Sequence, residues 1–114
     1  MVTRQEVQAH KDTIYVFGDN VVRLGYGGQA KECRGEPNCI GIPTKWSPYE
    51  YFSNKDLDIA KEHIDAAIKK ILQKKNEGYR IVVLPKIGEG LADLPNKAPL
   101  IYAYLKIMLK RIMW

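Results

Sequence analysis

The sequence contains few cysteines, no long hydrophobic run and no low-complexity stretch. Its two cysteines, Cys33 and Cys39, are too few for the disulfide framework of a small secreted domain. Its longest apolar stretches, such as residues 81–84, are short beside the roughly 20 residues that a membrane-spanning helix needs. Residues 1–10 are polar and lack the apolar region of a signal peptide. These absences favour a cytoplasmic protein with no membrane partner.

Side chains suited to metal binding are scarce and far apart. Cys33 and Cys39 are separated in the sequence from His10 and His63, and a structural zinc site needs four ligands at close spacing. Neither a G-x-x-x-x-G-K-[ST] phosphate loop nor a G-x-G-x-x-G dinucleotide turn is present. We therefore expect no metal and no cofactor, and the sequence disfavours ordinary nucleotide hydrolysis and hydride transfer.

The composition is that of a folded domain with surplus positive charge. Hydrophobic residues make up 46% of the chain and charged residues 27%, which argues against disorder and fits one domain over residues 1–114. Lysine and arginine number 18 against 13 acidic residues, so the formal net charge is +5. This surplus suits an anionic partner, either nucleic acid or a phosphorylated small molecule.

Short apolar runs alternate with amphipathic segments along the chain. Runs rich in β-branched and aromatic residues predict strands over residues 13–17, 39–42 and 80–84. From Leu57 onward, apolar residues recur at helical spacing and predict a long helix that Gly78 ends. This order of strands and helices predicts an α/β fold, whose strand-to-helix loops gather at one edge of a parallel sheet.

Several helix boundaries carry local signals. Residues 1–10 are interpreted as an edge strand or a short helix, and residues 29–33 as the start of a short helix. Ser53 and Asp56 are spaced as in a capping box before the long helix. Pro99 fits only the first turn of the last helix, which is predicted to begin at about residue 96. Six residues of this helix are expected to face inward: Leu100, Ile101, Tyr104, Leu105, Met108 and Ile112.

Two glycine-rich loops follow predicted strands and precede helical segments. The first runs from Gly18-Asp19-Asn20 to Gly25-Tyr26-Gly27-Gly28, and the second is Gly88-Glu89-Gly90-Leu91. Glycine lets backbone amides approach a phosphate closely, and a helix start adds positive potential. Tight turns also use glycine, and Asp19 and Asn20 are equally typical of turn chemistry and of ribose contact. Because both loops fall on one sheet edge, we predict that they form one phosphate-binding cleft.

The segment from Ile81 to Pro95 resembles the macro domain signature, in which a hydrophobic strand ends in proline and continues into a phosphate-binding loop. The family's other glycine loop is similar to Arg23-Leu24-Gly25-Tyr26-Gly27-Gly28-Gln29-Ala30. Within the family, the chain most resembles the terminal ADP-ribose protein glycohydrolase type. That branch has a strand ending in Thr-Lys, as in Ile42-Pro43-Thr44-Lys45, and a Gly-x-Gly-Leu loop, as in Gly88 to Asp93. The resemblance runs from about residue 12 to residue 108.

The resemblance implies a three-layer α/β/α domain with a mostly parallel sheet that binds ADP-ribose. It also implies removal of ADP-ribose from an acceptor, with Lys45 as the nucleophile and Asp93 as the acid that assists proton transfer. The family's acid directly follows the Gly-x-Gly-Leu, where this chain has Ala92. No segment supplies the acidic residue with which the family recognises adenine. The implied ligand-binding residues are Gly18, Asp19, Asn20, Arg23, Gly25, Tyr26, Gly27, Gly28, Gln29, Thr44, Ile87, Gly88, Glu89, Gly90 and Leu91.

Three functions remain open at this point. The chain could hydrolyse an ADP-ribosyl linkage on a macromolecule, bind an ADP-ribose-like small molecule without turnover, or bind nucleic acid nonspecifically. Trp46 and Tyr26 are candidates for base stacking, whereas Phe52 is expected to pack internally. The lysines of the long helix favour a solvated face over a nucleic-acid surface. They are Lys61, Lys69, Lys70, Lys74 and Lys75.

Overall fold

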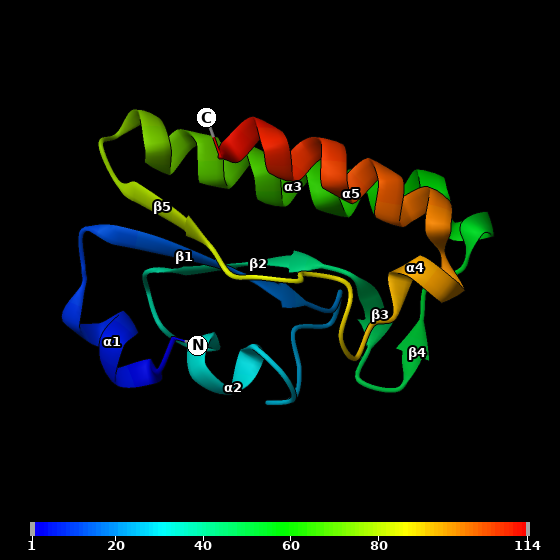
Figure 1. Ribbon diagram of the computed structural model, residues 1–114, viewed down its shortest axis with the longest axis horizontal. Helices are drawn as coiled ribbons and strands as arrows, with labels where there is room; N and C mark the ends of the chain where they lie inside the picture. Colours follow the sequence, from blue (N-terminus) through cyan, green and yellow to red (C-terminus); the bar gives the residue numbers. More distant parts are fainter. Residues whose placement is uncertain (1, 114) are drawn as a thin grey trace.

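Three parallel strands form the central sheet in the order β2-β1-β5 (Figure 1). They are β1 (Thr13–Asp19), β2 (Cys39–Pro43) and β5 (Arg80–Val83) in a computed structural model that describes residues 2–113. The strands predicted from the apolar runs are therefore confirmed. Because β1 lies between the other two, nearly all of its side chains are buried, which its continuous apolar sequence anticipates.

Helices cover both faces of the sheet, which confirms the predicted three-layer α/β/α arrangement (Figure 1). On one face, α3 (Leu57–Asn76) and α5 (Pro99–Ile112) enclose a core with alternate side chains of β1, including Ile14 and Val16. On the other face, the remaining side chains, Tyr15 and Phe17, pack against α1 (Arg4–Ala9) and α2 (Ala30–Cys33). The first ten residues thus contain a short helix and not an edge strand.

The long helix begins and ends where the sequence predicts. A 3₁₀ turn, η1 (Asn54–Asp56), leads into α3, and the Asp56 carboxylate accepts a hydrogen bond from the Ser53 amide at 2.9 Å. This bond is one half of the predicted capping box. After the helix, Gly78 has a φ of 99°, a left-handed conformation that glycine adopts without strain.

The predicted last helix is divided in two. A short helix, α4 (Leu94–Lys97), ends at Ala98, whose φ of −151° interrupts the helix, and α5 then begins at Pro99. The interruption arises because a residue before proline is disfavoured in the helical region. The expectation that Leu100 faces inward is wrong, since 54% of its surface is exposed. The buried stripe of α5 is instead formed by Ile101, Leu105, Met108, Leu109 and Ile112.

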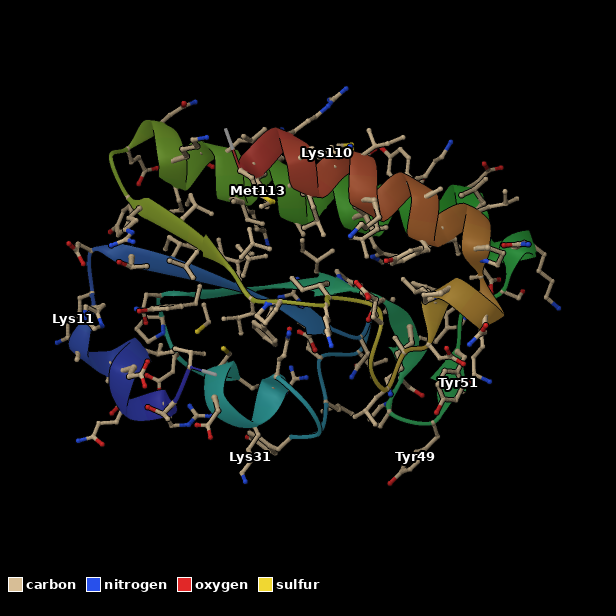
Figure 2. All side chains as sticks on the ribbon, viewed as in Figure 1. Lys11, Lys31, Tyr49, Tyr51, Lys110 and Met113 are labelled. Carbon is tan, nitrogen blue, oxygen red and sulfur yellow. The ribbon has the colours of Figure 1, made fainter. Side chains whose placement is uncertain are left out.

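A small hairpin between β2 and α3 was not predicted. It consists of β3 (Lys45–Ser47) and β4 (Glu50–Tyr51), and Tyr49 projects from its turn into solvent (Figure 2). Trp46 packs edge-on against Phe52, with the ring centroids 5.1 Å apart, so Phe52 is a core residue as expected. Among residues 2–113, no helix combines the length and apolar character that a membrane crossing would require.

Candidate functional site

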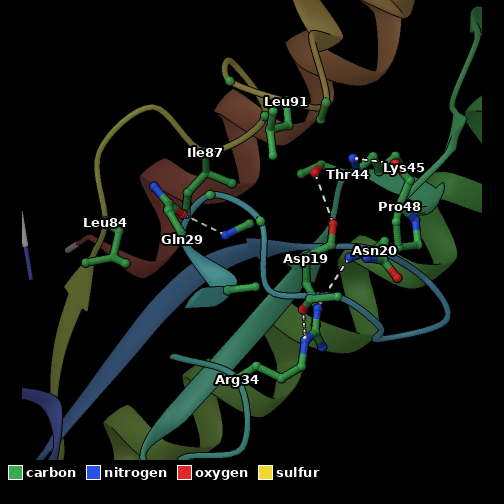
Figure 3. Close-up of a pocket in the computed structure, with 18 of the residues that line it drawn as sticks. Asp19, Asn20, Gln29, Arg34, Thr44, Lys45, Pro48, Leu84, Ile87 and Leu91 are labelled. Atoms are coloured by element: carbon green, nitrogen blue, oxygen red, sulfur yellow. Dashed lines mark hydrogen bonds and ion pairs between the residues drawn. The ribbon is translucent and has the colours of Figure 1, made fainter. Parts of the chain in front are cut away.

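A cleft of about 760 Å³ lies at the carboxyl edge of the sheet, between the loop that follows β1 and the loop that follows β5 (Figure 3). The hairpin contributes its turn to the same cleft. Most residues predicted from the sequence as site residues line it. They are Gly18, Asp19, Asn20, Gly25, Tyr26, Gly27, Gly28, Gln29, Thr44, Lys45, Ile87, Gly88, Glu89, Gly90 and Leu91.

Two predicted site residues, Arg23 and Asp93, are not in the cleft lining. Arg23 borders a separate hollow beside α3, with His63 and Lys70. Asp93 directly precedes α4, where its backbone is left-handed and its Oδ1 accepts a hydrogen bond from Asn96 Nδ2 at 2.9 Å. Ala92 is therefore in the lining of the cleft, whereas Asp93 lies at the start of a helix.

Asp19 and Arg34, which both line the cleft, form an ion pair at the end of β1 (Figure 3). Arg34 Nη2 lies 2.5 Å from Asp19 Oδ1, and the exposed fractions of the two side chains are 13% and 6%. The same guanidinium donates to the carbonyls of Gly25 and Leu24, at 2.6 and 3.2 Å. Arg34 therefore holds the first glycine loop against the end of β1.

The side chains of Asp19 and Asn20 are occupied by hydrogen bonds within the chain. Asp19 Oδ1 also accepts from the Asn20 amide at 2.8 Å, and Asn20 Nδ2 donates to the Leu24 carbonyl at 2.8 Å. Asn20 Oδ1 accepts in turn from the Leu24 amide at 3.2 Å. These bonds close the turn after β1, so the geometry favours turn chemistry over direct ribose contact for both residues.

Gln29 joins the two glycine loops through its side-chain amide. Its Oε1 accepts from the Gly18 amide at 2.8 Å, and its Nε2 donates to the Pro85 carbonyl at 2.6 Å. The two loops also lie close together at Gly27 and Leu91. A Cβ added to Gly27 would lie 3.0 Å from Leu91 Cδ1, so there is little space between them. The bridge and this contact set the spacing between the two walls of the cleft.

Many backbone amides in the two loops have no partner. Within residues 2–113, the amides of residues 25–29 donate no hydrogen bond, and neither do those of residues 86–88 and 90–91. Unpaired amides at a cleft are potential anion donors. The helices that follow, α2 and α4, have only four residues each, so the expected helix-start potential is small and the loop amides themselves are the available donors.

Lys45 lies at the hairpin side of the cleft, half-buried. Its Nζ donates to the Pro48 carbonyl at 3.2 Å and lies 5.2 Å from the centroid of the Tyr51 ring. Burial lowers the pKa of the Lys45 amine below its ordinary value. A larger fraction of this amine is therefore neutral at a given pH than for an exposed lysine.

The sequence did not point to several lining residues. Arg34 gave no signal because its partner Asp19 lies 15 positions away in the sequence. Tyr49 borders the cleft only because it lies in the turn of the unpredicted hairpin. Leu24, Tyr26, Tyr49 and Leu91 are all largely exposed, so the cleft is bordered by apolar surface. No group of three or more His, Cys, Asp or Glu side chains is arranged for metal binding within residues 2–113.

Fold and site together define an α/β domain with a cleft between two glycine loops at the carboxyl edge of a parallel sheet. The chain belongs to a family described as a family of unknown function, DUF7831, which matches residues 1–108. Comparison with curated proteins and with solved structures gives no match.

Proposed function

We propose that this chain binds ADP-ribose, or a closely related nucleotide derivative, in the cleft between its two glycine loops. The observation that carries the proposal is the row of unpaired backbone amides on two loops that face each other across the cleft. A diphosphate has several acceptor oxygens and would satisfy donors on both walls at once. The resemblance of both loops to those of macro domains supports the same ligand.

Size and charge of the cleft are consistent with such a ligand. Its volume of about 760 Å³ falls within the usual range of small-molecule sites, which is about 300–1,000 Å³. The charges of Arg34 and Asp19 neutralise each other in their ion pair. The remaining charged side chains of the lining are two basic ones, Lys45 and Lys86, and one acidic one, Glu89. The apolar rim, including Tyr26 and Tyr49, would provide flat surface for a base.

The proposal predicts measurable binding of ADP-ribose that depends on Lys86. Replacing Lys86 by alanine should weaken binding by about tenfold, or about 1.4 kcal/mol, because a positive charge beside the diphosphate is lost. Lys110→Ala is the matched control, since Lys110 projects from the outer side of α5, away from the cleft (Figure 2). Calorimetric titration of the two variants and the wild type measures the effect.

Nucleic-acid binding is the competing outcome of this titration. If single-stranded DNA gives heat that disappears with added salt while ADP-ribose gives none, the cleft proposal is wrong. If Lys86→Ala and Lys110→Ala weaken ADP-ribose binding equally, the proposal is also contradicted. The affinity would then depend on the net charge of the protein and not on the position of the lysine.

A second candidate function is hydrolysis of an ADP-ribosyl linkage. The observation in its favour is that Lys45 lines the cleft and that burial lowers the pKa of its amine. Its neutral amine would attack the anomeric carbon of the distal ribose, and the acceptor group would leave with a proton. Glu89 takes the place of Asp93 as the candidate proton donor, because it is the lining carboxyl outside the Asp19–Arg34 pair. Water would then release the sugar from the lysine.

This second candidate predicts a trappable adduct on Lys45. When the chain is incubated with ADP-ribose and borohydride, reduction of the imine should label Lys45 and leave Lys110 unlabelled, as peptide mass spectrometry would show. The labelling should increase with pH and reach its half-maximum at a lower pH than for an exposed lysine, because the Lys45 pKa is lowered. Lys45→Arg, which keeps the charge, should abolish the adduct. Label spread evenly over lysines would exclude Lys45 as the nucleophile.

A further inference from the structure

The outer edge of β2 presents main-chain groups that the sheet leaves unpaired. β2 is a terminal strand and pairs with β1 alone. The Tyr15 amide donates to the Asn38 carbonyl, and the Thr44 amide donates to the carbonyl at the end of β1, both at 2.9 Å. Alternate residues of a strand turn their main-chain groups to the same side, so the even-numbered residues from 38 to 44 face β1. Among residues 2–113, the outward groups without a hydrogen-bond partner are the Gly41 amide and the carbonyls of Cys39, Gly41 and Pro43.

A groove follows this edge, between α3 on one face of the sheet and the chain after α2 on the other (Figure 1). We call this hollow of about 370 Å³ the β2 groove, and its lining includes Gly35, Gly41, Ala66 and Lys70. Gly41 has no side chain, and Ala66 of α3 is exposed and carries only a methyl group. Such small residues leave the main chain of β2 open to the approach of a second backbone.

The charged side chains of the β2 groove are mostly basic. Arg23 and Lys70 line it, are exposed, and form no ion pair within residues 2–113. His63, which is half-buried, belongs to the same lining and gains a positive charge when it is protonated. The acid of the lining, Asp19, is already paired with Arg34 at 2.5 Å. The β2 groove therefore suits a partner that carries negative charge.

We propose that the β2 groove binds an extended acidic segment of a partner protein, which joins the sheet as a strand beside β2. Such a segment would donate its amides to the outward carbonyls of β2 and accept a hydrogen bond from the Gly41 amide. Main-chain bonds would then supply affinity, while charge selects the partner. A second copy of this chain is disfavoured, because it would bring its own Arg23 and Lys70 against those already there. The proposal does not depend on the ligand of the cleft.

Binding is tested by fluorescence anisotropy with a labelled peptide of about eight residues in which glutamate and valine alternate. Lys70→Glu places a negative charge in the groove and should weaken binding by at least about tenfold. Lys69→Glu is the matched control, because it makes the same change in net charge at a neighbouring exposed position of α3 that lines a different hollow. It should weaken binding by less than about twofold. Absence of binding at about 1 mM peptide, or equal weakening by the two variants, would overturn the proposal.

Addition as a strand is separated from simple charge attraction by methylating the peptide amides. Two peptides of the same sequence are used, each methylated at one of the two alternating sets of amides. Their charge is unchanged, but a methylated amide cannot donate to the carbonyls of β2. At least one of the two should therefore bind at least about tenfold more weakly than the unmodified peptide. If both bind as tightly as the unmodified peptide, charge alone holds the peptide and strand addition is wrong.

The position of the peptide is tested by following the backbone amide resonances of the protein as the unmodified peptide is added. The Gly41 amide resonance should shift, whereas that of Gly90, which lines the cleft, should not. A shift at Gly90 without one at Gly41 would place the peptide in the cleft and contradict the proposal. In gel filtration the free chain should be monomeric. A dimer that the peptide dissociates would assign the outer edge of β2 to a second copy instead.

Discussion

Replacing Arg34 by alanine is expected to lower the free energy of unfolding by about 3–5 kcal/mol, because it leaves the Asp19 carboxylate buried without its ionic partner. The exposed fractions of the two side chains are only 13% and 6%, so solvent screens the intact pair little. The variant also loses the bonds that hold the Leu24 and Gly25 carbonyls. Urea denaturation followed by circular dichroism would measure the change.

Two further variants separate the buried charge from a general effect of losing an arginine. Arg4 pairs with Glu36, but its side chain is 33% exposed, so Arg4→Ala should cost clearly less than Arg34→Ala. The double variant Arg34→Met with Asp19→Asn removes both charges and should be more stable than Arg34→Met alone. A loss of under about 1 kcal/mol for Arg34→Ala, as for a surface pair, would mean that solvent screens this ion pair.

Replacing Gly88 by alanine is the second change with a large expected effect. Gly88 has a φ of 83°, and a Cβ there would lie 2.8 Å from Leu94 Cδ1 and 3.0 Å from Leu105 Cδ2. Both leucines are fully buried, so they cannot move into solvent to make room. The backbone strain and the overpacking together should cost about 2–4 kcal/mol, measured by the same denaturation experiment.

Gly90→Ala is the matched control in the same loop. A Cβ at Gly90 would meet no atom within 4 Å, and Gly90 is not among the glycines with positive φ. This substitution should change the free energy of unfolding by less than about 1 kcal/mol and can be slightly stabilising, since alanine restricts the unfolded chain. If Gly88→Ala and Gly90→Ala lower the free energy of unfolding by similar amounts, the space around each glycine does not decide the cost of adding a side chain to this loop.

The sequence predicted the strands, the long helix and the α/β class because each depends on local pattern, whereas the three layers were implied by the resemblance. The continuous apolar run of β1 is typical of a strand buried on both faces, and Ser53 with Asp56 has the spacing of a capping box at a helix start. The hairpin was missed because Lys45–Ser47 and Glu50–Tyr51 are too short to show an alternating pattern. Leu100 was misplaced because, in the first turn of α5, an apolar residue can face outward without breaking the inward stripe.

The position of the candidate site was predicted, but its internal bonding was not. Glycine spacing alone located both loops that line the cleft. The bridge from Gln29 to Pro85 spans 56 positions, and the pair of Arg34 with Asp19 spans 15, so no local pattern could reveal either. Such bonds depend on how the strands are ordered in the sheet, which the sequence leaves open.

The central place of β1 has a consequence for the order in which the chain folds. Its pairing with β2 joins residues such as Tyr15 and Cys39, 24 positions apart, whereas its pairing with β5 joins Val16 and Val83, 67 positions apart. Closing the longer loop costs about 0.9 kcal/mol more chain entropy, so β5 should join after β2. The bond from Gln29 to Pro85 can form only then, so the two walls of the cleft are joined after the pairing of β1 with β2.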